Sequence, residues 1–138
     1  MRRMKPIDIE DVLQKDLSQA AAASGLSISI SGTPVPSNLG ANLPYAVIER
    51  VGGSRWSELI DKHAVSIDVW SNRWAVSNDY ASELVSLVQA LPDMDDSTVD
   101  YYEAGIDAFP YNNPDLRHED LPRVSFTATV ICRAKAID

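Results

Sequence analysis

The sequence predicts an α+β fold, with a mainly antiparallel sheet of about four or five strands and two helices packed on one face. Two long segments carry apolar residues at helical spacing, and five others have the alternation or the boundaries of strands. The length of 138 residues matches one domain. We therefore expect a single domain over residues 1–138, in the order helix, two strands, strand, helix, two strands.

The first helix is predicted over residues 6–24, where acidic residues at the start are followed by apolar residues at helical spacing. Gly25 supplies the usual stop. A strand follows over 26–31, because Leu26, Ile28 and Ile30 alternate with serines. Residues 32–44 contain three prolines and two glycines, which resist both helix and central strand. We expect an extended proline-rich loop there.

In the middle of the chain, the sequence pattern predicts two strands separated by a flexible turn. Residues 45–51 form the first, and the turn covers 51–55 around two glycines. Residues 64–71 show the clearest alternation in the sequence. The apolar side of this predicted strand holds Val65, Ile67 and Val69, and the polar side holds Ser66, Asp68 and Trp70.

The second helix is predicted over residues 73–91, before Pro92 ends it. Residues 99–108 predict a strand with a bulge at Gly105, since a glycine inside a β pattern often marks such an irregularity. A loop is expected over 109–122. The closing strand, 123–135, alternates apolar residues with more polar ones, and its apolar side is Val124, Phe126, Ala128, Val130 and Cys132.

The composition excludes several classes of protein. A formal net charge of −8 is the wrong sign for a protein that grips phosphate backbones, so we expect no specific nucleic-acid binding. The single cysteine cannot form an internal disulfide, and two histidines cannot build the commoner Cys/His zinc sites. No apolar run approaches the length of a membrane span, and we expect no export signal and no membrane contact.

Acidic residues are concentrated in one stretch. Residues 93–120 hold nine acids against Arg117 alone, a net charge of −8. We expect a local acidic surface around one strand and its flanking loops. Its candidate members are Asp93, Asp95, Asp96, Asp100, Glu103 and Asp107.

Catalytic patterns are weak, and we predict no catalytic, cofactor-binding or metal-ligating residues and no cofactor. The sequence has neither a Gly-x-Ser-x-Gly nucleophile motif nor a phosphate-binding glycine motif. Cys132 lies on the apolar side of its strand and is expected to be a buried thiol. The enzymatic alternative is a small metal-dependent hydrolase that uses Asp115, His118 and Glu119.

The sequence supports surfaces for contact with other proteins better than it supports a reaction centre. The polar side of the sheet carries small neutral side chains, and its candidate interface residues are Asp68, Thr127 and Thr129. Trp70 is a candidate because an exposed aromatic often marks an interface, although packing against a loop is an equal alternative. Pro34 and Pro36 are candidates because a stiff loop loses less entropy on docking. The alternative for the polar side of the sheet is an ordinary solvated face, and the alternative for the proline-rich segment is a plain loop without a partner.

Several segments resemble the tail-terminator proteins of long-tailed bacteriophages, over about residues 6–135. They are Leu-Pro-Tyr-Ala-Val-Ile at 43–48, the strand His-Ala-Val-Ser-Ile-Asp-Val-Trp-Ser at 63–71 and the helix over 81–91. The loop Asp-Leu-Arg-His-Glu-Asp at 115–120, between an acidic strand and a closing strand, agrees with that family. Neck and other head-tail joining proteins share much of this pattern and are the alternative.

The resemblance implies a structural role. Such proteins form a ring, typically a hexamer, that caps the finished tail tube, ends its polymerisation and presents a surface to the head-completion or connector protein. The chain would then lie at the head-proximal end of the virion tail, after assembly in the host cytoplasm. If the acidic residues 93–107 lined the ring, their charge would repel passing DNA and keep it from sticking.

Overall fold

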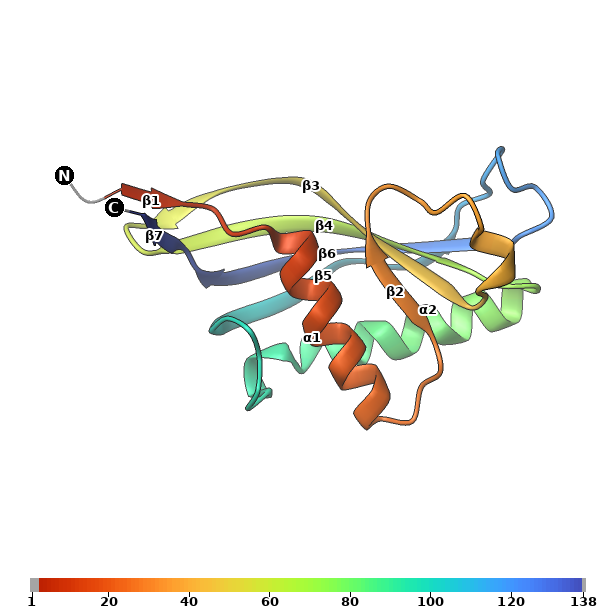
Figure 1. Cartoon of the computed structure of the whole chain (residues 1–138), viewed down its shortest axis with the longest axis horizontal. Helices are drawn as coiled ribbons and strands as arrows, with labels where there is room; N and C mark the ends of the chain where they lie inside the picture. Colours follow the sequence, from red (N-terminus) through yellow and green to blue (C-terminus); the bar gives the residue numbers. More distant parts are fainter. Residues whose placement is uncertain (1–2, 138) are drawn as a thin grey trace.

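The structure, a computed structural model, describes residues 3–137 and has an α+β fold, as the sequence predicts (Figure 1). Two α-helices pack on one face of a five-stranded sheet whose strand order is β2-β3-β4-β6-β5. A separate pair, β1 and β7, joins the two ends of the described chain. The helices are α1 (Ile9–Ala23) and α2 (Trp74–Gln89), and the 3-10 turns are η1 (Leu39–Ala41) and η2 (Leu91–Asp93). The strands are β1 (Arg3–Lys5), β2 (Ser29–Gly32), β3 (Tyr45–Ser57), β4 (Ile60–Trp70), β5 (Tyr101–Asn112), β6 (Arg123–Arg133) and β7 (Lys135–Ile137).

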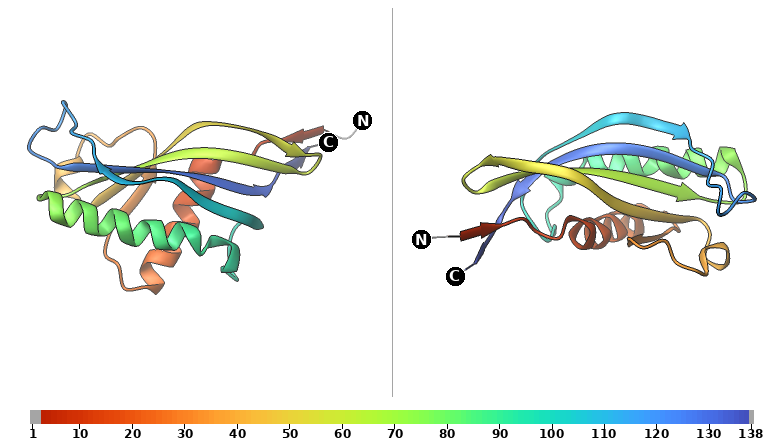
Figure 2. Two further views of the ribbon diagram at one scale, coloured as in Figure 1. Left: turned by 180° about the vertical axis from the view of Figure 1, so that it is seen from behind. Right: turned by 90° about the horizontal axis from the view of Figure 1, so that it is seen from above.

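The sheet is antiparallel except where β2 pairs parallel to β3. Both helices cover the same face, as the two views of Figure 2 show. The expected apolar sides of β4 and β6 meet these helices, and Val65, Ile67, Val69 and Phe126 are fully buried there. Burial of this apolar surface is the main force that holds the helices on the sheet.

Helix α1 begins where Asp8 accepts a hydrogen bond from the Asp11 N–H at 3.4 Å, which caps the first turn. Its buried face contains Ile9, Leu13 and Leu17 at the expected spacing. Two carboxylates, Glu10 and Asp16, are buried on this helix as well. The sequence pattern did not reveal them, because their positions become internal only when other segments cross the helix.

The β3–β4 hairpin is much longer than predicted. Residues 51–55, expected to be a flexible turn, belong to β3, and residues 52–55 pair with β4. The ladder shifts register between Arg50 and Gly52, as at a β-bulge. Gly53 has a φ of 154°, and a Cβ there would lie 2.4 Å from the Lys62 carbonyl oxygen. The glycine therefore permits close strand pairing rather than a turn.

The structure changes the expected bounds of the other strands. Of the strand predicted over 26–31, only the last residues belong to β2. β5 continues to Asn112, so the loop expected from 109 is shorter. Gly105 itself pairs with Thr129, and the register shifts lie on either side of it instead. β6 ends at Arg133, beyond which the chain turns into β7.

The paired strands β1 and β7 extend beyond the end of the five-stranded sheet (Figure 1). We call them the terminal ribbon. It lies beside the tip of the β3–β4 hairpin, where an Arg55 Nη2 donates to the Met4 carbonyl at 3.3 Å. The Ala134 N–H, just before the ribbon, donates to the Leu59 carbonyl at 2.8 Å. Strands of three residues are too short to show a sequence pattern, so the ribbon was not predicted.

Candidate functional site

The polar face of the sheet is built from β4 and β6. Asp68, Thr127 and Thr129 are half-buried on the face opposite the helices. Asp68 accepts a short hydrogen bond from the Ser125 hydroxyl, and Thr129 donates to Asp107 at 2.6 Å. These contacts give Asp68 and Thr129 hydrogen-bond partners without forming a nucleophile and base pair. The face offers small hydrogen-bonding side chains for contact.

Trp70 is not exposed, contrary to the expectation that placed it on the polar face. It is fully buried and packs with Leu39 and Val47 in a second cluster, apart from the main core. Its indole Nε1–H donates to Asp115 at 3.1 Å, and the Arg123 guanidinium lies 5.9 Å from the ring centroid. The proline-rich loop and the 113–122 loop fold over the indole, so the alternative of packing against a loop is the one observed.

The proline-rich loop is anchored at its start and in its middle. Its first residues contact α1, where Thr33 donates to Glu10 from its backbone at 2.8 Å and from its hydroxyl at 2.6 Å. Leu39 is buried under the loop. Pro34 is exposed and Pro36 is half-buried between these anchors. The loop is therefore a folded surface segment that presents the two prolines at its outer side.

The acidic candidates do not form one cluster. Asp93, Asp95 and Asp96 are exposed in η2 and the turn after it, on the helix side of the sheet. Asp100 is exposed just before β5, and Glu103 and Asp107 are exposed on that strand. Within residues 3–137, no three His, Cys, Asp or Glu side chains are arranged to hold a metal ion. No helix in the same range combines the length and apolarity needed to cross a bilayer.

The group Asp115, His118 and Glu119 is not assembled as a reaction centre. Asp115 accepts from Trp70, from the Arg117 N–H at 3.0 Å and from His118 Nδ1 at 2.8 Å. Burial would raise the pKa of Asp115, but these hydrogen bonds outweigh it and lower the pKa below its ordinary value. Glu119 is exposed. The carboxylate of Asp115 fixes the loop and keeps it folded against Trp70.

Sequence reasoning missed Glu10, which joins three elements. Its carboxylate accepts from Thr33 and also from Arg50, whose N–H lies 3.0 Å and whose Nε lies 3.2 Å from Oε2. Burial would raise the pKa of Glu10, but the hydrogen bonds from Arg50 and Thr33 outweigh it and lower the pKa from 4.5 to about 2. The ionised form is thus favoured in the folded chain.

Glu10→Gln is expected to remove a pH-dependent part of the stability. Because the folded pKa lies below the unfolded one, the stabilisation is complete above pH 4.5 and is lost as the pH falls toward 2. The shift corresponds to about 3 kcal/mol. Urea unfolding across this pH range measures it. Glu83→Gln, at an exposed position of α2, should retain the wild-type pH dependence, and an equally steep profile in Glu10→Gln would contradict the assignment.

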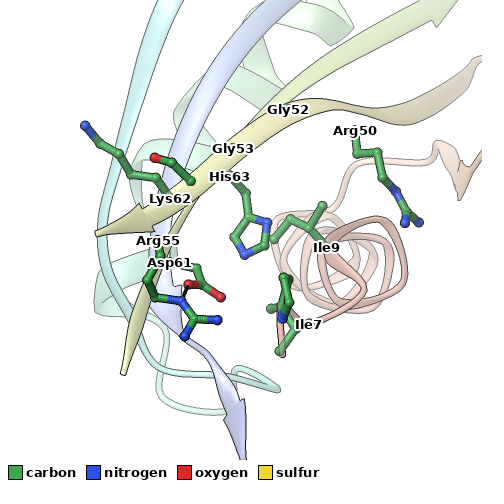
Figure 3. A pocket seen from close by; sticks show the side chains of 11 residues that line it. Ile7, Ile9, Arg50, Gly52, Gly53, Arg55, Asp61, Lys62 and His63 are labelled. Carbon is green, nitrogen blue, oxygen red and sulfur yellow. Dashed lines mark hydrogen bonds and ion pairs between the residues drawn. The ribbon is translucent and has the colours of Figure 1, made fainter. Parts of the chain in front are cut away.

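A cavity of 330 Å³ lies between the β3–β4 hairpin and the start of α1 (Figure 3). Ile7 and Ile9 form an apolar side, and Asp61 and His63 point into it from β4. Arg55 pairs with one oxygen of Asp61. Asp61 Oδ2 and His63 Nε2 are buried without a hydrogen-bond partner among the described residues. Burial is the main reason that the pKa of His63 is lowered.

Comparisons with known proteins identify the fold. No family model and no curated protein matches this chain. Among 23 matching chains of solved structures, one belongs to a structure described as the virion of a native gene transfer agent (GTA) particle. The two chains share 12% sequence identity with a TM-score of 0.57, over 91% of this chain and 98% of the other. The two proteins have the same fold along nearly their whole lengths.

Proposed function

We propose that this chain is a structural, non-enzymatic protein of a phage-like virion and acts as a tail terminator. Copies of the chain form a ring, typically a hexamer, on the head-proximal end of the finished tail tube. The ring stops addition of tube protein and contacts the head-completion or connector protein. The host cytoplasm is the proposed place of assembly.

The observation that carries this proposal is the fold shared with a chain of the GTA virion over 91% of this chain. A second support is the sequence resemblance to tail terminators over residues 43–48, 63–71, 81–91 and 115–120. On the sheet face Asp68 pairs with Ser125 and Thr129 pairs with Asp107, and the Asp115 carboxylate holds a loop in place. These features suit a protein that works through contact surfaces.

A ring follows from one kind of contact repeated in one direction. When the same two different surfaces of each copy meet head to tail, the assembly closes if the rotation between copies divides a full turn. One domain over residues 1–138 supplies both surfaces in this proposal. The polar sheet face and the proline-rich loop, with Pro34 exposed and Pro36 half-buried, are proposed contact surfaces for the tube or for neighbouring copies.

The proposed channel role concerns the acidic stretch. The exposed carboxylates from Asp93 to Asp107 would give a channel wall negative charge, which repels DNA and prevents binding during its passage. Reversal of Asp95 and Asp96 to lysine, at exposed positions outside the proposed contact surfaces, would then slow DNA passage while leaving tail assembly unchanged.

Addition of this chain to growing tail tubes is expected to give tubes of uniform, limited length, because a ring on the open end removes the binding site for the next tube subunit. Electron microscopy of tubes assembled from the tail tube protein of the same virion measures the length distribution. Leu17→Asp, which places a charge in the fully buried core, is the unfolded control. Unlimited growth in the presence of the folded chain would contradict termination, and binding to the connector alone would favour the head-tail joining alternative.

A further inference from the structure

We infer that the cavity beside Asp61 and His63 receives the 113–122 loop of a second copy of this chain, with Leu116 as the inserted side chain. This inference rests on the proposed function, because it names the two surfaces that meet between neighbouring copies of the ring. Four observations lead to it: the unpartnered atoms of the cavity, the charge around it, the exposure of Leu116 and the positions of the two surfaces in the fold.

The cavity lacks a partner for two polar atoms. Asp61 and His63 are 3% and 6% exposed, and Asp61 Oδ2 and His63 Nε2 have no hydrogen-bond partner in the part of the chain described. A buried polar group without a partner is unfavourable, and nearly all such groups in folded proteins are satisfied. The cavity is open on one side and apolar on another through Ile7 and Ile9. It therefore fits an apolar side chain carried by a backbone that brings hydrogen-bonding groups.

The surroundings of the cavity are positively charged. The hairpin tip, the last residue of β6 and the terminal ribbon, together called the basic end, carry six exposed cations against Glu58 and the buried Asp61. This charge stands out in a chain with a net charge of −8. An acidic segment is the complementary partner. The six cations are Arg3, Lys5, Arg55, Lys62, Arg133 and Lys135.

The 113–122 loop has the matching features. Leu116 is 83% exposed, which is the highest value among the large hydrophobic side chains of the described residues. The loop also carries Asp115, Glu119 and Asp120 against one arginine. The hydrogen bonds of Asp115 to Trp70 and His118 hold the loop in one conformation beside Leu116. An apolar side chain fixed on an ordered loop is a typical anchor of a protein interface.

The two surfaces lie at opposite ends of the molecule. The basic end is at one end of the long axis, beside both termini, and the 113–122 loop is at the other (Figures 1 and 2). A chain cannot bring its own loop to its own cavity across this distance. Two complementary surfaces at opposite ends produce head-to-tail contacts, which are the contacts that a closed ring requires.

Disulfide trapping between two variants tests the contact. We expect Leu116→Cys and Ile7→Cys, mixed in the presence of tail tubes under oxidising conditions, to form a cross-linked dimer of one copy of each. Cys132 does not compete, because it is buried and burial raises the pKa of its thiol to about 11. Ser86→Cys, at an exposed position of α2, is the matched control that should not cross-link with Leu116→Cys.

Charge reversal tests the complementarity in the same assay. Reversing Lys62 and Lys135 to glutamate is expected to lower the yield of cross-linked dimer about tenfold, and reversing Glu119 and Asp120 to lysine in the other copy should restore it. Lys15→Glu, an exposed reversal on α1, should have little effect. Absence of the cross-link, cross-linking of the cavity cysteine to tube protein, or failure of the second reversal to restore the yield would overturn the inference.

The test of the inferred contact can fail without the test of tail termination failing, and the reverse also holds. If Leu116→Asp still limits tube length, the inferred contact is wrong while termination stands. If the cross-link forms but the chain does not limit tube length, the contact stands and termination is wrong.

Discussion

Asp16→Ala is expected to lower the free energy of unfolding by about 3 to 5 kcal/mol, a large part of the stability of a small domain. Asp16 is fully buried on α1 and accepts three hydrogen bonds. The Thr98 N–H and hydroxyl donate at 2.9 Å, and the Tyr101 hydroxyl donates at 2.5 Å. Alanine would leave the buried Tyr101 hydroxyl without an acceptor, and it would release the segment before β5, where Thr98 is exposed, from α1. Urea unfolding measures the change.

Asp11→Ala is the matched control on the same helix. Asp11 is half exposed and pairs with Lys15 at 2.9 Å, so its loss should cost about 0.5 kcal/mol or less. Tyr101→Phe removes one donor and should give an intermediate loss. Burial and the hydrogen bond to Asp16 raise the pKa of Tyr101, so its hydroxyl remains a donor at all ordinary pH values. Similar losses for Asp16→Ala and Asp11→Ala would show that the buried carboxylate is unimportant.

Trp70→Ala should destabilise the chain by about 3 to 5 kcal/mol, because it removes the largest fully buried side chain and leaves a cavity. The loss should also release the two loops that cover the indole, since Leu39 and Asp115 both contact it. We expect limited proteolysis to cut the 113–122 loop faster in this variant. Thermal unfolding and peptide mapping of the cleaved chain measure the two effects.

Two further variants separate packing from the hydrogen bond of Trp70. Trp70→Phe keeps most of the apolar contact but loses the Nε1–H donor to Asp115, and should cost about 1 to 2 kcal/mol. Trp74→Ala is the control, because Trp74 is 40% exposed at the start of α2. Faster cleavage of the loop in Trp74→Ala but not in Trp70→Ala would contradict the role assigned to the indole.

Local patterns predicted most of the fold because they report directly on burial. The alternation in 64–71 and 123–133 correctly separates the helix-facing side chains from the polar ones, and helical spacing locates both helices. The pattern failed at Gly52 and Gly53, which lie in β3 and not in a turn, and Gly53 serves close strand pairing. Glycine has the same sequence signal in both situations, since the difference depends on the neighbouring strand.

The candidate surfaces were predicted less completely. Asp68, Thr127 and Thr129 do share the polar face, because strand periodicity fixes the side on which each lies. The same rule misplaced Trp70, since a strand residue on the outer face becomes buried when a loop crosses it. The cavity at Asp61 and His63 had no signal at all, because its other wall comes from Ile7 and Ile9, more than 50 positions away.

The amino-acid order by itself determined the fold class, the helices and the inner and outer faces of the central strands, because each of these depends on residues close together in the chain. Tertiary structure decided which outer residues are covered, which carboxylates are buried and where polar atoms lack partners. Those properties depend on contacts between distant segments, such as α1 with Thr98 and β4 with the 113–122 loop. Hydrogen bonding and burial at such contacts are set by geometry that no local pattern of residues encodes.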